Sequence, residues 1–255
     1  CQRRSIIKSI KMVDGKKVVI VTQARIGSTR FPKKIIQKLG GKTLIDHHLD
    51  RLLMVINKDK VIVATTKEAG IKELIGLLSQ KEVLVYQGST NNVLDRFFHA
   101  VKNENPDYVV RVTSDCPLID PKLIDEVIAF TIQNELDYGS NILRELFPDG
   151  QDIEVFRFSV LNRAYNEATL NSDKEHVTPY IRRNSSFLGG ELFKSDNYEC
   201  KNDFNGVRMT VDEKSDLEAC EIMVSKLGDD AGWKAYTDFI INNQELFTNQ
   251  KIKRN

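Results

Sequence analysis

Four short apolar runs, each rich in β-branched residues, recur along the first half of the chain and restrict its fold more than any other feature. They cover residues 17–22, 60–65, 82–86 and 107–113. Apolar runs of this length are typical of strands buried on both faces, and a segment with helical apolar spacing separates each run from the next. This alternation over short connections predicts a three-layer α/β/α fold with a mostly parallel sheet.

Residues that can cap helices stand before three of the helical segments. We expect Thr43 to cap the first helix, and Asn91 or Asn92 to cap a later one. Asp120 is followed by Pro121, which is a strong helix start because proline tolerates the first helical position and aspartate accepts free N–H groups.

The second half is less regular, and we expect it to extend the same sheet and to add a small flap. Residues 1–16 are expected to form a flexible basic extension, residues 17–255 a single domain, and residues 137–205 the flap or a dimerisation region. The expected elements of this half are strands at 152–156 and 206–211 and helices at 159–168, 172–183, 215–227 and 233–247, with Ser159 and Ser172 as caps of the first two helices.

Charge and cysteine content narrow the functional classes. The 255 residues include 37 Lys and Arg against 36 Asp and Glu, a formal net charge of +1, which argues against bulk electrostatic binding to nucleic acid or to an anionic membrane. No run of about 18 apolar residues predicts a membrane span. The four cysteines are scattered and form no CxxC pair, so we expect reduced thiols and a cytoplasmic protein.

A basic loop follows the first strand, at residues 22–34. Small residues there let backbone N–H groups approach a phosphate, while guanidinium and ammonium groups neutralise it. The loop matches neither the GxGxxG nor the GxxxxGK[ST] pattern, and a solvated basic loop is an equally good interpretation from composition alone. Its cations are Arg25, Arg30, Lys33 and Lys34, and its small residues are Gly27, Ser28 and Thr29.

Two aspartates follow expected strands elsewhere in the chain. Asp115 comes two residues after the fourth strand, and Asp212 directly follows the expected strand at 206–211. Ligands of open parallel sheets bind outside the carboxyl ends of the strands, so both carboxylates are expected to face the basic loop. Mg²⁺ takes few protein oxygens and shares its other positions with phosphate and water, which such a pair would suit. Taken singly, each is more often a capping or loop acid.

A further polar cluster lies at residues 148–156, and Glu175 and His176 follow on an expected helix. The histidine is a candidate substrate ligand, although a helical surface or interface position is an equal alternative. The sequence has no nucleophile elbow and no zinc motif. Cys116 is expected to pack and not to react, because the neighbouring Asp115 would raise the thiol pKa.

At these clusters the chain resembles the SpsF-like cytidylyltransferases, relatives of the enzymes that make CMP-linked KDO and CMP-linked sialic acids. The resemblance implies the Rossmann-like fold of nucleotide-diphospho-sugar transferases. It also implies a reaction in which a sugar-acid hydroxyl attacks the α-phosphorus of CTP and pyrophosphate leaves. The matching stretches are QARIGSTRFPKK, VIVATT, GSTNNVLDRF, RVTSDCPLIDP, PDGQDIEVF, EHVTPYI and RMTVDEKSDLE, in this order between residues 23 and 218.

The resemblance also implies roles for particular residues, with Mg²⁺ as the cofactor. Arg25, Arg30 and Lys34 would be catalytic and hold the triphosphate, and Asp115 and Asp212 would bind the metal. Nucleotide binding would fall to Gln23, Ala24, Gly27, Ser28, Ala64, Thr65 and Arg111, and substrate binding to Gln151, Asp152, Glu154 and His176.

By the same similarity we expect a homodimer that binds CTP and a small sugar acid. The apolar residues Val177, Pro179, Tyr180 and Ile181 offer a face for the dimer, with a core-facing helix as the equal alternative.

Three positions depart from the family pattern. Gln87 stands where an arginine is common, Asn91 or Asn92 where an acid is common, and Lys33 where a small residue is usual. Two other functions stay open, and Gln87 and Lys33 support only the second of them. One is a sugar transferase that uses a nucleotide sugar, disfavoured because no Asp-x-Asp motif ends a strand, and the other is a nucleotide-binding protein without catalysis.

Overall fold

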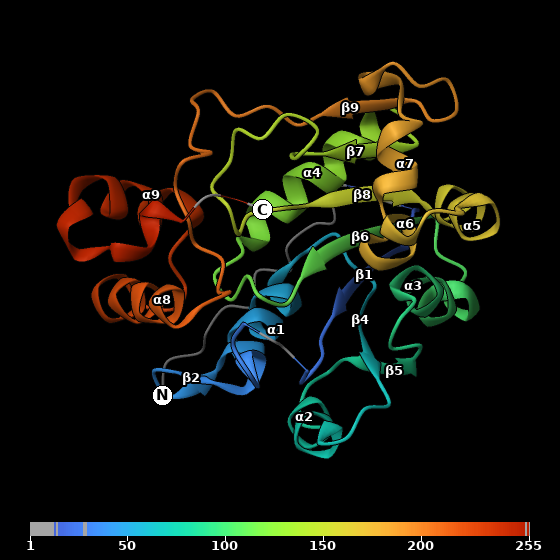
Figure 1. Cartoon of the computed structure of the whole chain (residues 1–255). Helices are drawn as coiled ribbons and strands as arrows, with labels where there is room; N and C mark the ends of the chain where they lie inside the picture. Colours follow the sequence, from blue (N-terminus) through green and yellow to red (C-terminus); the bar gives the residue numbers. More distant parts are fainter. Residues whose placement is uncertain (1–12, 14, 28–29, 253, 255) are drawn as a thin grey trace, which may run out of the picture.

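A seven-stranded sheet forms the centre of this computed structural model, which describes residues 13, 15–27, 30–252 and 254 (Figure 1). The expected extension at 1–16 and the predicted phosphate ligand Ser28 fall largely or wholly outside the described residues. Within the described ranges, no helix is long and apolar enough to cross a membrane.

The first half supplies four parallel strands, as predicted from the apolar runs. These are β1 (Val18–Gln23), β4 (Lys60–Thr66), β5 (Leu84–Gly88) and β6 (Tyr108–Thr113), in the spatial order β5-β4-β1-β6. Because all four run in the same direction, their carboxyl ends meet at one edge of the sheet. The predicted α/β fold with a mostly parallel sheet is confirmed.

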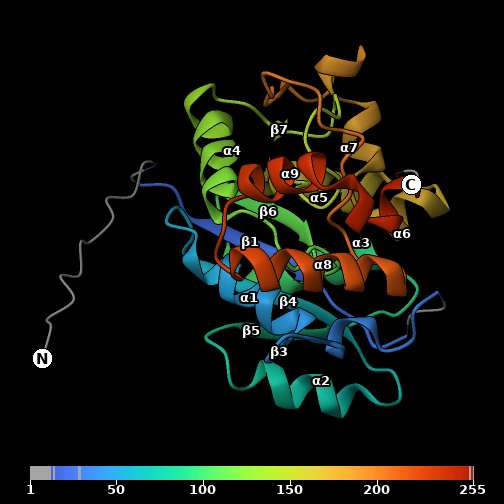
Figure 2. The same cartoon turned by 90° about the vertical axis from the view of Figure 1, so that its left-hand side faces the viewer.

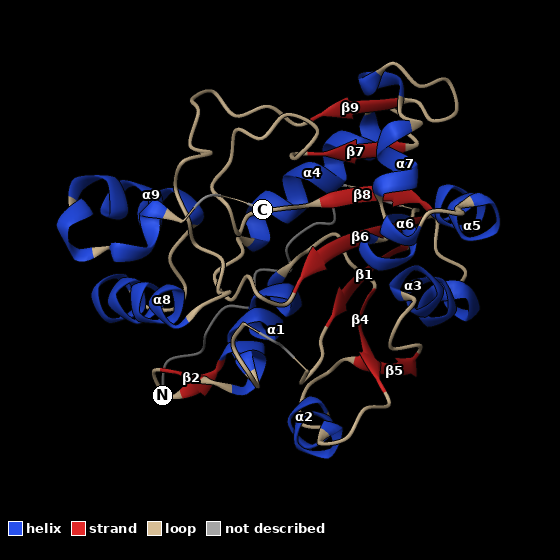
Figure 3. Cartoon of the chain, in the orientation of Figure 1, coloured by secondary structure: helices blue, strands red, loops and turns tan. Residues whose placement is uncertain are grey.

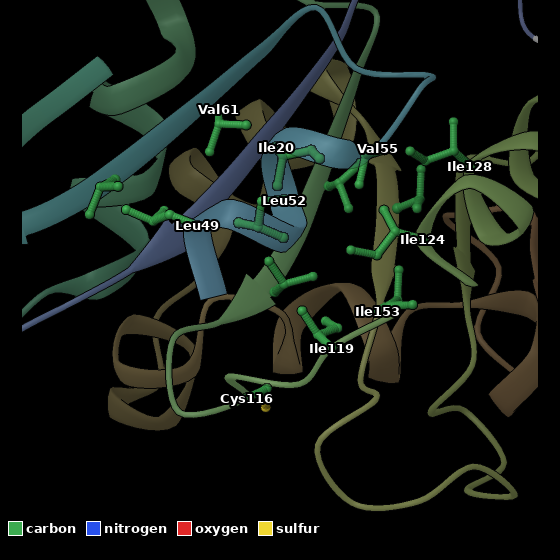
Figure 4. Packing of buried hydrophobic residues seen from close by; sticks show 14 of the residues in the cluster. Ile20, Leu49, Leu52, Val55, Val61, Cys116, Ile119, Ile124, Ile128 and Ile153 are labelled. Atoms are coloured by element: carbon green, nitrogen blue, oxygen red, sulfur yellow. The ribbon is translucent and has the colours of Figure 1, made fainter. Parts of the chain in front are cut away.

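Successive β1 side chains enter two different cores, because side chains alternate across a strand. Ile20 packs with residues of α1 (Leu44–Met54), α2 (Ile71–Leu78) and α4 (Pro121–Gln133). Figure 4 shows Ile20 beside Leu49 and Leu52 in this cluster. Val19 and Val21 pack on the opposite side with α3 (Val93–Val101) and α5 (Phe158–Glu167), and the helices therefore cover both faces of the sheet (Figure 3).

The predicted caps of the first half are confirmed. The Thr43 hydroxyl accepts from the Asp46 N–H, and the Asp46 carboxylate accepts from the Thr43 N–H, forming a capping box at α1. At α3 the cap is Asn92 and not Asn91. The Asp120 carboxylate accepts from the Lys122 N–H at the start of α4.

The second half extends the sheet with three more strands. β8 (Glu154–Arg157) is antiparallel to β6 and to β7 (Tyr138–Ser140), and β9 (Ser195–Asn197) forms the edge parallel to β7. The predicted strand at 152–156 is therefore present, shifted toward its carboxyl end.

The helices of this half differ from the prediction in both caps and in the continuity of one helix. α5 begins at Phe158 after an extended Arg157, so Ser159 lies inside the helix and is not its cap. The single helix expected at 172–183 is two helices, α6 (Asn171–His176) and α7 (Pro179–Arg183), because Pro179 has no N–H to continue the first one. The cap position of α6 is Leu170, so Ser172 lies inside this helix and is not its cap.

The predicted dimer face at the start of α7 is a core face instead. Val177 and Ile181 are fully buried in the cluster on the α3 side of the sheet, and Tyr180 is almost so. The core-facing alternative is therefore confirmed for these side chains, and a homodimer stays a prediction.

The strand expected at residues 206–211 is wrong. This segment makes one isolated bridge, between Asp149 and Arg208, and no ladder. Its backbone groups bond instead to the backbone of Asp149, to the Asp115 carbonyl and to the Gln250 side chain. It packs under α8 (Lys214–Leu227) and α9 (Trp233–Asn242), which lie together on one side of the molecule (Figure 2).

The remaining regular elements are short. They are the antiparallel pair β2 (Lys38–Leu39) and β3 (Lys42–Thr43) and 3₁₀ turns at Lys34–Ile36, Lys102–Glu104, Ser186–Leu188, Gln244–Leu246 and Thr248–Lys251.

Candidate active site

A polar cavity of about 620 Å³ opens where the carboxyl ends of β1 and β6 meet. Gln23 and Ala24 line it at the end of β1, and Thr113, Ser114 and Asp115 line it at the end of β6. Its position follows from the sheet order, because two neighbouring parallel strands deliver their end loops to the same place.

The basic loop forms one wall of the cavity. Arg25, Arg30 and Lys34 line it, as the phosphate-binding prediction requires. The N–H groups of Ile26 and Gly27 both donate to Oε1 of Glu68, at 2.7 and 3.2 Å. A carboxylate oxygen therefore accepts from backbone N–H groups of the loop that was predicted to bind a phosphate.

Asp115 and Asp212 come from distant parts of the chain and meet at the Lys34 ammonium. Lys34 Nζ lies 3.4 Å from Asp115 Oδ2 and 3.0 Å from Asp212 Oδ1, and Arg30 Nη2 lies 3.3 Å from the same Asp212 oxygen. The predicted convergence of the two carboxylates with the basic loop is therefore present.

Charge pairing decides the protonation of this group. Burial raises the pKa of Asp115, but the Lys34 ammonium and a hydrogen bond from Thr113 outweigh it, and the net pKa lies below the ordinary value. Burial lowers the pKa of Lys34, whereas the two carboxylates raise it to a net value above normal. Near neutral pH the site therefore holds Lys34 and Asp115 in their charged forms.

Arg208 holds Asp212 from the other side. Its guanidinium contacts Asp212 Oδ2 at 3.3 Å, Asp149 Oδ2 at 2.8 Å and both oxygens of the fully buried Asp216. The Asp212 N–H also donates to Asp216. The sequence analysis missed Arg208. The pattern that could have indicated it is a single arginine in an apolar segment, followed by acids four and eight residues later.

Arg96 lines the cavity and is the second residue that the sequence interpretation missed. It is 2% exposed, donates to the Ser89 carbonyl, and its Nε has no hydrogen-bond partner among the described residues. Burial lowers its pKa, and the nearby Arg25 adds to the effect. The signal was a charged residue on the apolar face of α3.

Helix α6 contributes a further part of the cavity lining. Lys174 and His176 line the cavity, and a substrate-binding role for His176 stays a prediction. The buried Asp173 carboxylate pairs with Arg183 and fixes α6 to α7. Val177 follows His176 with a φ of 71°, a conformation that β-branched residues rarely adopt.

The remaining predicted ligands do not line this cavity, and burial or a structural partner accounts for each of them. Ala64 and Thr65 are fully buried within β4. Arg111 and Glu154 form an ion pair between β6 and β8, and Glu154 also accepts from Tyr138 and Thr178. Gln151 is 0% exposed and bonds to Asp120 and Leu118, and Asp152 pairs with Arg254. Binding roles for these residues stay predictions.

The donor set fits a magnesium ion. The carboxylates of Asp115 and Asp212 both reach the Lys34 ammonium, so two carboxylates face one position in the cavity. This suits Mg²⁺, which is commonly held by one or two carboxylates together with substrate phosphates.

Cys116 is buried, and burial raises its thiol pKa well above normal, in agreement with a packing role.

Comparison with known proteins adds an independent line. A family model described as cytidylyltransferase matches residues 18–244. The chain is 28% identical to the spore coat polysaccharide biosynthesis protein SpsF of Bacillus subtilis over 222 residues, covering 83% of this chain and 88% of that protein. It is 34% identical to the 3-deoxy-manno-octulosonate cytidylyltransferase of Elusimicrobium minutum over 110 residues, 43% and 44% of the two chains.

A solved structure is similar over nearly the whole chain. A cytidylyltransferase from Leptospira borgpetersenii superposes with a TM-score of 0.86 at 31% identity, covering 94% of this chain and all of that one. The family match and the structural likeness agree on both fold and class.

Proposed function

The chain belongs to the cytidylyltransferase family, and we propose that it transfers a cytidylyl group from CTP to a sugar acid for surface polysaccharide synthesis. A hydroxyl oxygen of the sugar acid would form a bond to the α-phosphorus, the bond from that phosphorus to the β-phosphate oxygen would break, and the hydroxyl proton would be lost. The products are a CMP-sugar and pyrophosphate. The observation that carries the proposal is the meeting of Asp115, Asp212 and Lys34 in one cavity.

The basic wall would receive the triphosphate. Arg25, Arg30 and Lys34 all reach the cavity and carry positive charge toward it. Pyrophosphate gains negative charge as it leaves, so cations fixed near it stabilise the transition state more than the ground state. Arg96 adds a buried positive charge to the same cavity.

Asp115 and Asp212 would hold Mg²⁺ together with phosphate oxygens. When bound, the metal would neutralise charge on the phosphates and keep them in position. The protein's own part is to fix the two carboxylates: the end of β6 positions Asp115, and Arg208 and Asp216 position Asp212.

The sugar acid would bind between helix α6 and the metal site. His176 and Lys174 supply hydrogen-bond donors there that suit the carboxylate of such an acceptor. A role in polysaccharide synthesis draws support from the name of the B. subtilis relative, and a sugar-acid acceptor draws support from the name of the E. minutum relative.

Pyrophosphate release with each of four nucleoside triphosphates and a panel of sugar acids tests the proposal. We expect turnover with CTP, and a loss of about 100-fold or more in kcat for Asp212→Asn, because one metal ligand is lost. Asp238→Asn, on the exposed surface of α9, is the matched control and should keep full activity.

Two results would overturn the proposal. Tight CTP binding without product from any acceptor would favour a non-catalytic nucleotide-binding protein. Preferential binding of a UDP- or GDP-sugar over CTP would favour a sugar transferase.

A further inference from the structure

The oxygens that would hold the metal already have cationic partners within the protein. Lys34 Nζ contacts Asp115 Oδ2 and Asp212 Oδ1, Arg30 contacts Asp212 Oδ1, and Arg208 contacts Asp212 Oδ2. A divalent cation that coordinates both aspartates would lie beside the Lys34 ammonium. The divalent cation and the Lys34 ammonium would repel each other strongly, because like charges that lie side by side in a poorly solvated site interact with little screening.

We propose that Lys34 holds the place of the divalent cation between Asp115 and Asp212, and that the triphosphate draws this ammonium away so that the metal can bind. The inference rests on the proposed function, because it takes the nucleotide and the metal from there. It goes further in two ways. It gives Lys34 two alternating partners, the pair of aspartates and the triphosphate, and it has the nucleotide prepare the site for the metal.

The side chain is built for such an exchange. Lys34 stands at the start of a 3₁₀ turn, lines the cavity together with Arg25, and keeps 12% of its side chain exposed. Lysine carries a compact charge on a flexible four-carbon stem, so Nζ can turn from the carboxylates to a phosphate without backbone movement. Arg208, in contrast, is fixed by Asp149 and Asp216 and stays with Asp212.

The exchange makes metal and nucleotide binding help each other. Removing Lys34 from the carboxylates costs its two ion pairs, and the triphosphate supplies replacement pairs only when it is present. Metal affinity should therefore be low without nucleotide and higher with it, and the same coupling factor must apply to nucleotide affinity.

Titration with Mn²⁺, followed by the electron paramagnetic resonance signal of the free ion, tests the inference. Without nucleotide, Lys34→Met should bind Mn²⁺ about 10-fold more tightly than the wild type, because the competing charge is gone. Lys34→Arg keeps the charge and should bind as weakly as the wild type.

Lys42 provides a matched control away from the cavity. Its Nζ also bridges two carboxylates, Asp50 and Asp229, each at 3.0 Å. Lys42→Met should leave the affinity for Mn²⁺ unchanged at the cavity, and adding Asp212→Asn to Lys34→Met should abolish the gain. Circular dichroism and the thermal midpoint would establish that each variant is folded.

A second arm adds α,β-methylene CTP, which lacks the scissile oxygen. The wild type should then bind Mn²⁺ about 10-fold more tightly than without nucleotide, and Lys34→Met should gain less, since its competing charge is already absent. All chains are compared at one nucleotide concentration, because the nucleotide itself binds Mn²⁺.

A folded Lys34→Met that binds Mn²⁺ no more tightly than the wild type would overturn the inference. This first arm uses neither nucleotide nor acceptor, so its outcome is separate from that of the turnover assay. If Lys34→Met gains affinity while no acceptor is cytidylylated, the place-holding role stands and the proposed function fails.

Discussion

The two carboxylates of the cavity are held in place by opposite kinds of structure. Asp115 follows β6, whose backbone bonds to β1 and β8 within the central sheet and whose side chains enter apolar cores. Asp212 ends a segment without a ladder, held by buried charges around Arg208 and by hydrogen bonds to Gln250. The site therefore has one side that is held by burial of apolar side chains, here called the Asp115 wall, and one side that is held by ion pairs, here called the Asp212 wall. Different conditions should destabilise the two sides.

The Asp115 wall contains one buried polar anchor. His48 is fully buried on α1, where its Nε2 bonds to the Thr22 hydroxyl and its Nδ1 to the Cys116 carbonyl. This carbonyl belongs to the residue after Asp115, so His48 fixes the turn that presents the carboxylate. The imidazole must stay neutral to accept from Thr22 while it donates to Cys116.

The largest expected effect breaks the Asp212 wall. Arg208→Met should lower the free energy of unfolding by about 3–5 kcal/mol, because buried Asp216 and its neighbours lose their compensating charge. Urea denaturation at neutral pH measures this change. Arg144→Met is the matched control: Arg144 pairs with Glu199 on the surface, so its loss should cost about 1 kcal/mol or less.

Equal stability losses for these two arginine variants would contradict the account. Arg208 would then be no more important than a surface ion pair, and the polar network would not hold the Asp212 segment in place.

A smaller effect tests the Asp115 wall through pH. Burial lowers the pKa of His48 to about 4, although the Cys116 carbonyl and the Asp115 carboxylate oppose the shift. The unfolded chain, with an ordinary histidine pKa of 6.5, therefore binds more protons than the folded one between these values. The contribution of His48 to the free energy of unfolding is fully present above pH 6.5. It should fall by about 3 kcal/mol as the pH is lowered to 4.

Urea denaturation at pH 7 and pH 4.5 checks this contribution against His48→Gln. Glutamine keeps a donor and an acceptor but does not titrate in this range, so the variant should lose less stability on acidification than the wild type. An identical pH dependence in the two chains would show that His48 does not couple the Asp115 wall to pH.

The smallest expected effect on stability concerns the backbone hydrogen bonds of the Asp212 segment. The Gln250 amide accepts from the Arg208 N–H and donates to the Arg208 carbonyl, which replaces the ladder bonds of a strand. Gln250→Ala should cost about 1–2 kcal/mol of unfolding free energy. Thermal denaturation measures the loss, with exposed Gln244→Ala as a control expected to change little. A loss no larger than the control's would remove Gln250 from the account.

Local patterns were enough to predict the first half of the fold. The apolar runs and the caps at Thr43 and Asp120 act within a few residues, so the sequence near each element determines it. Position within the sheet was not predictable in this way. The run that forms β5 looks buried, yet it forms an edge of the sheet, where Leu84 and Val85 are exposed.

Contacts between distant residues explain what was missed. Segment 206–211 reads as a strand, but its partners Asp149 and Gln250 lie about 40 to 60 positions away, and no local pattern reveals them. Glu68 escaped notice because its role depends on reaching the Ile26 and Gly27 amides across the cavity edge. The convergence of Asp115 with Asp212 was predicted from the rule for strand ends, but that rule applies only to Asp115, because the strand expected before Asp212 is absent.

A crystal structure with CTP and Mn²⁺ most directly tests whether the two walls serve one metal. The account predicts a single anomalous peak within coordination distance of a carboxylate oxygen from both Asp115 and Asp212, with Lys34 turned toward the triphosphate. A peak that touches neither or only one of these aspartates, with Lys34 still bridging them, would contradict it.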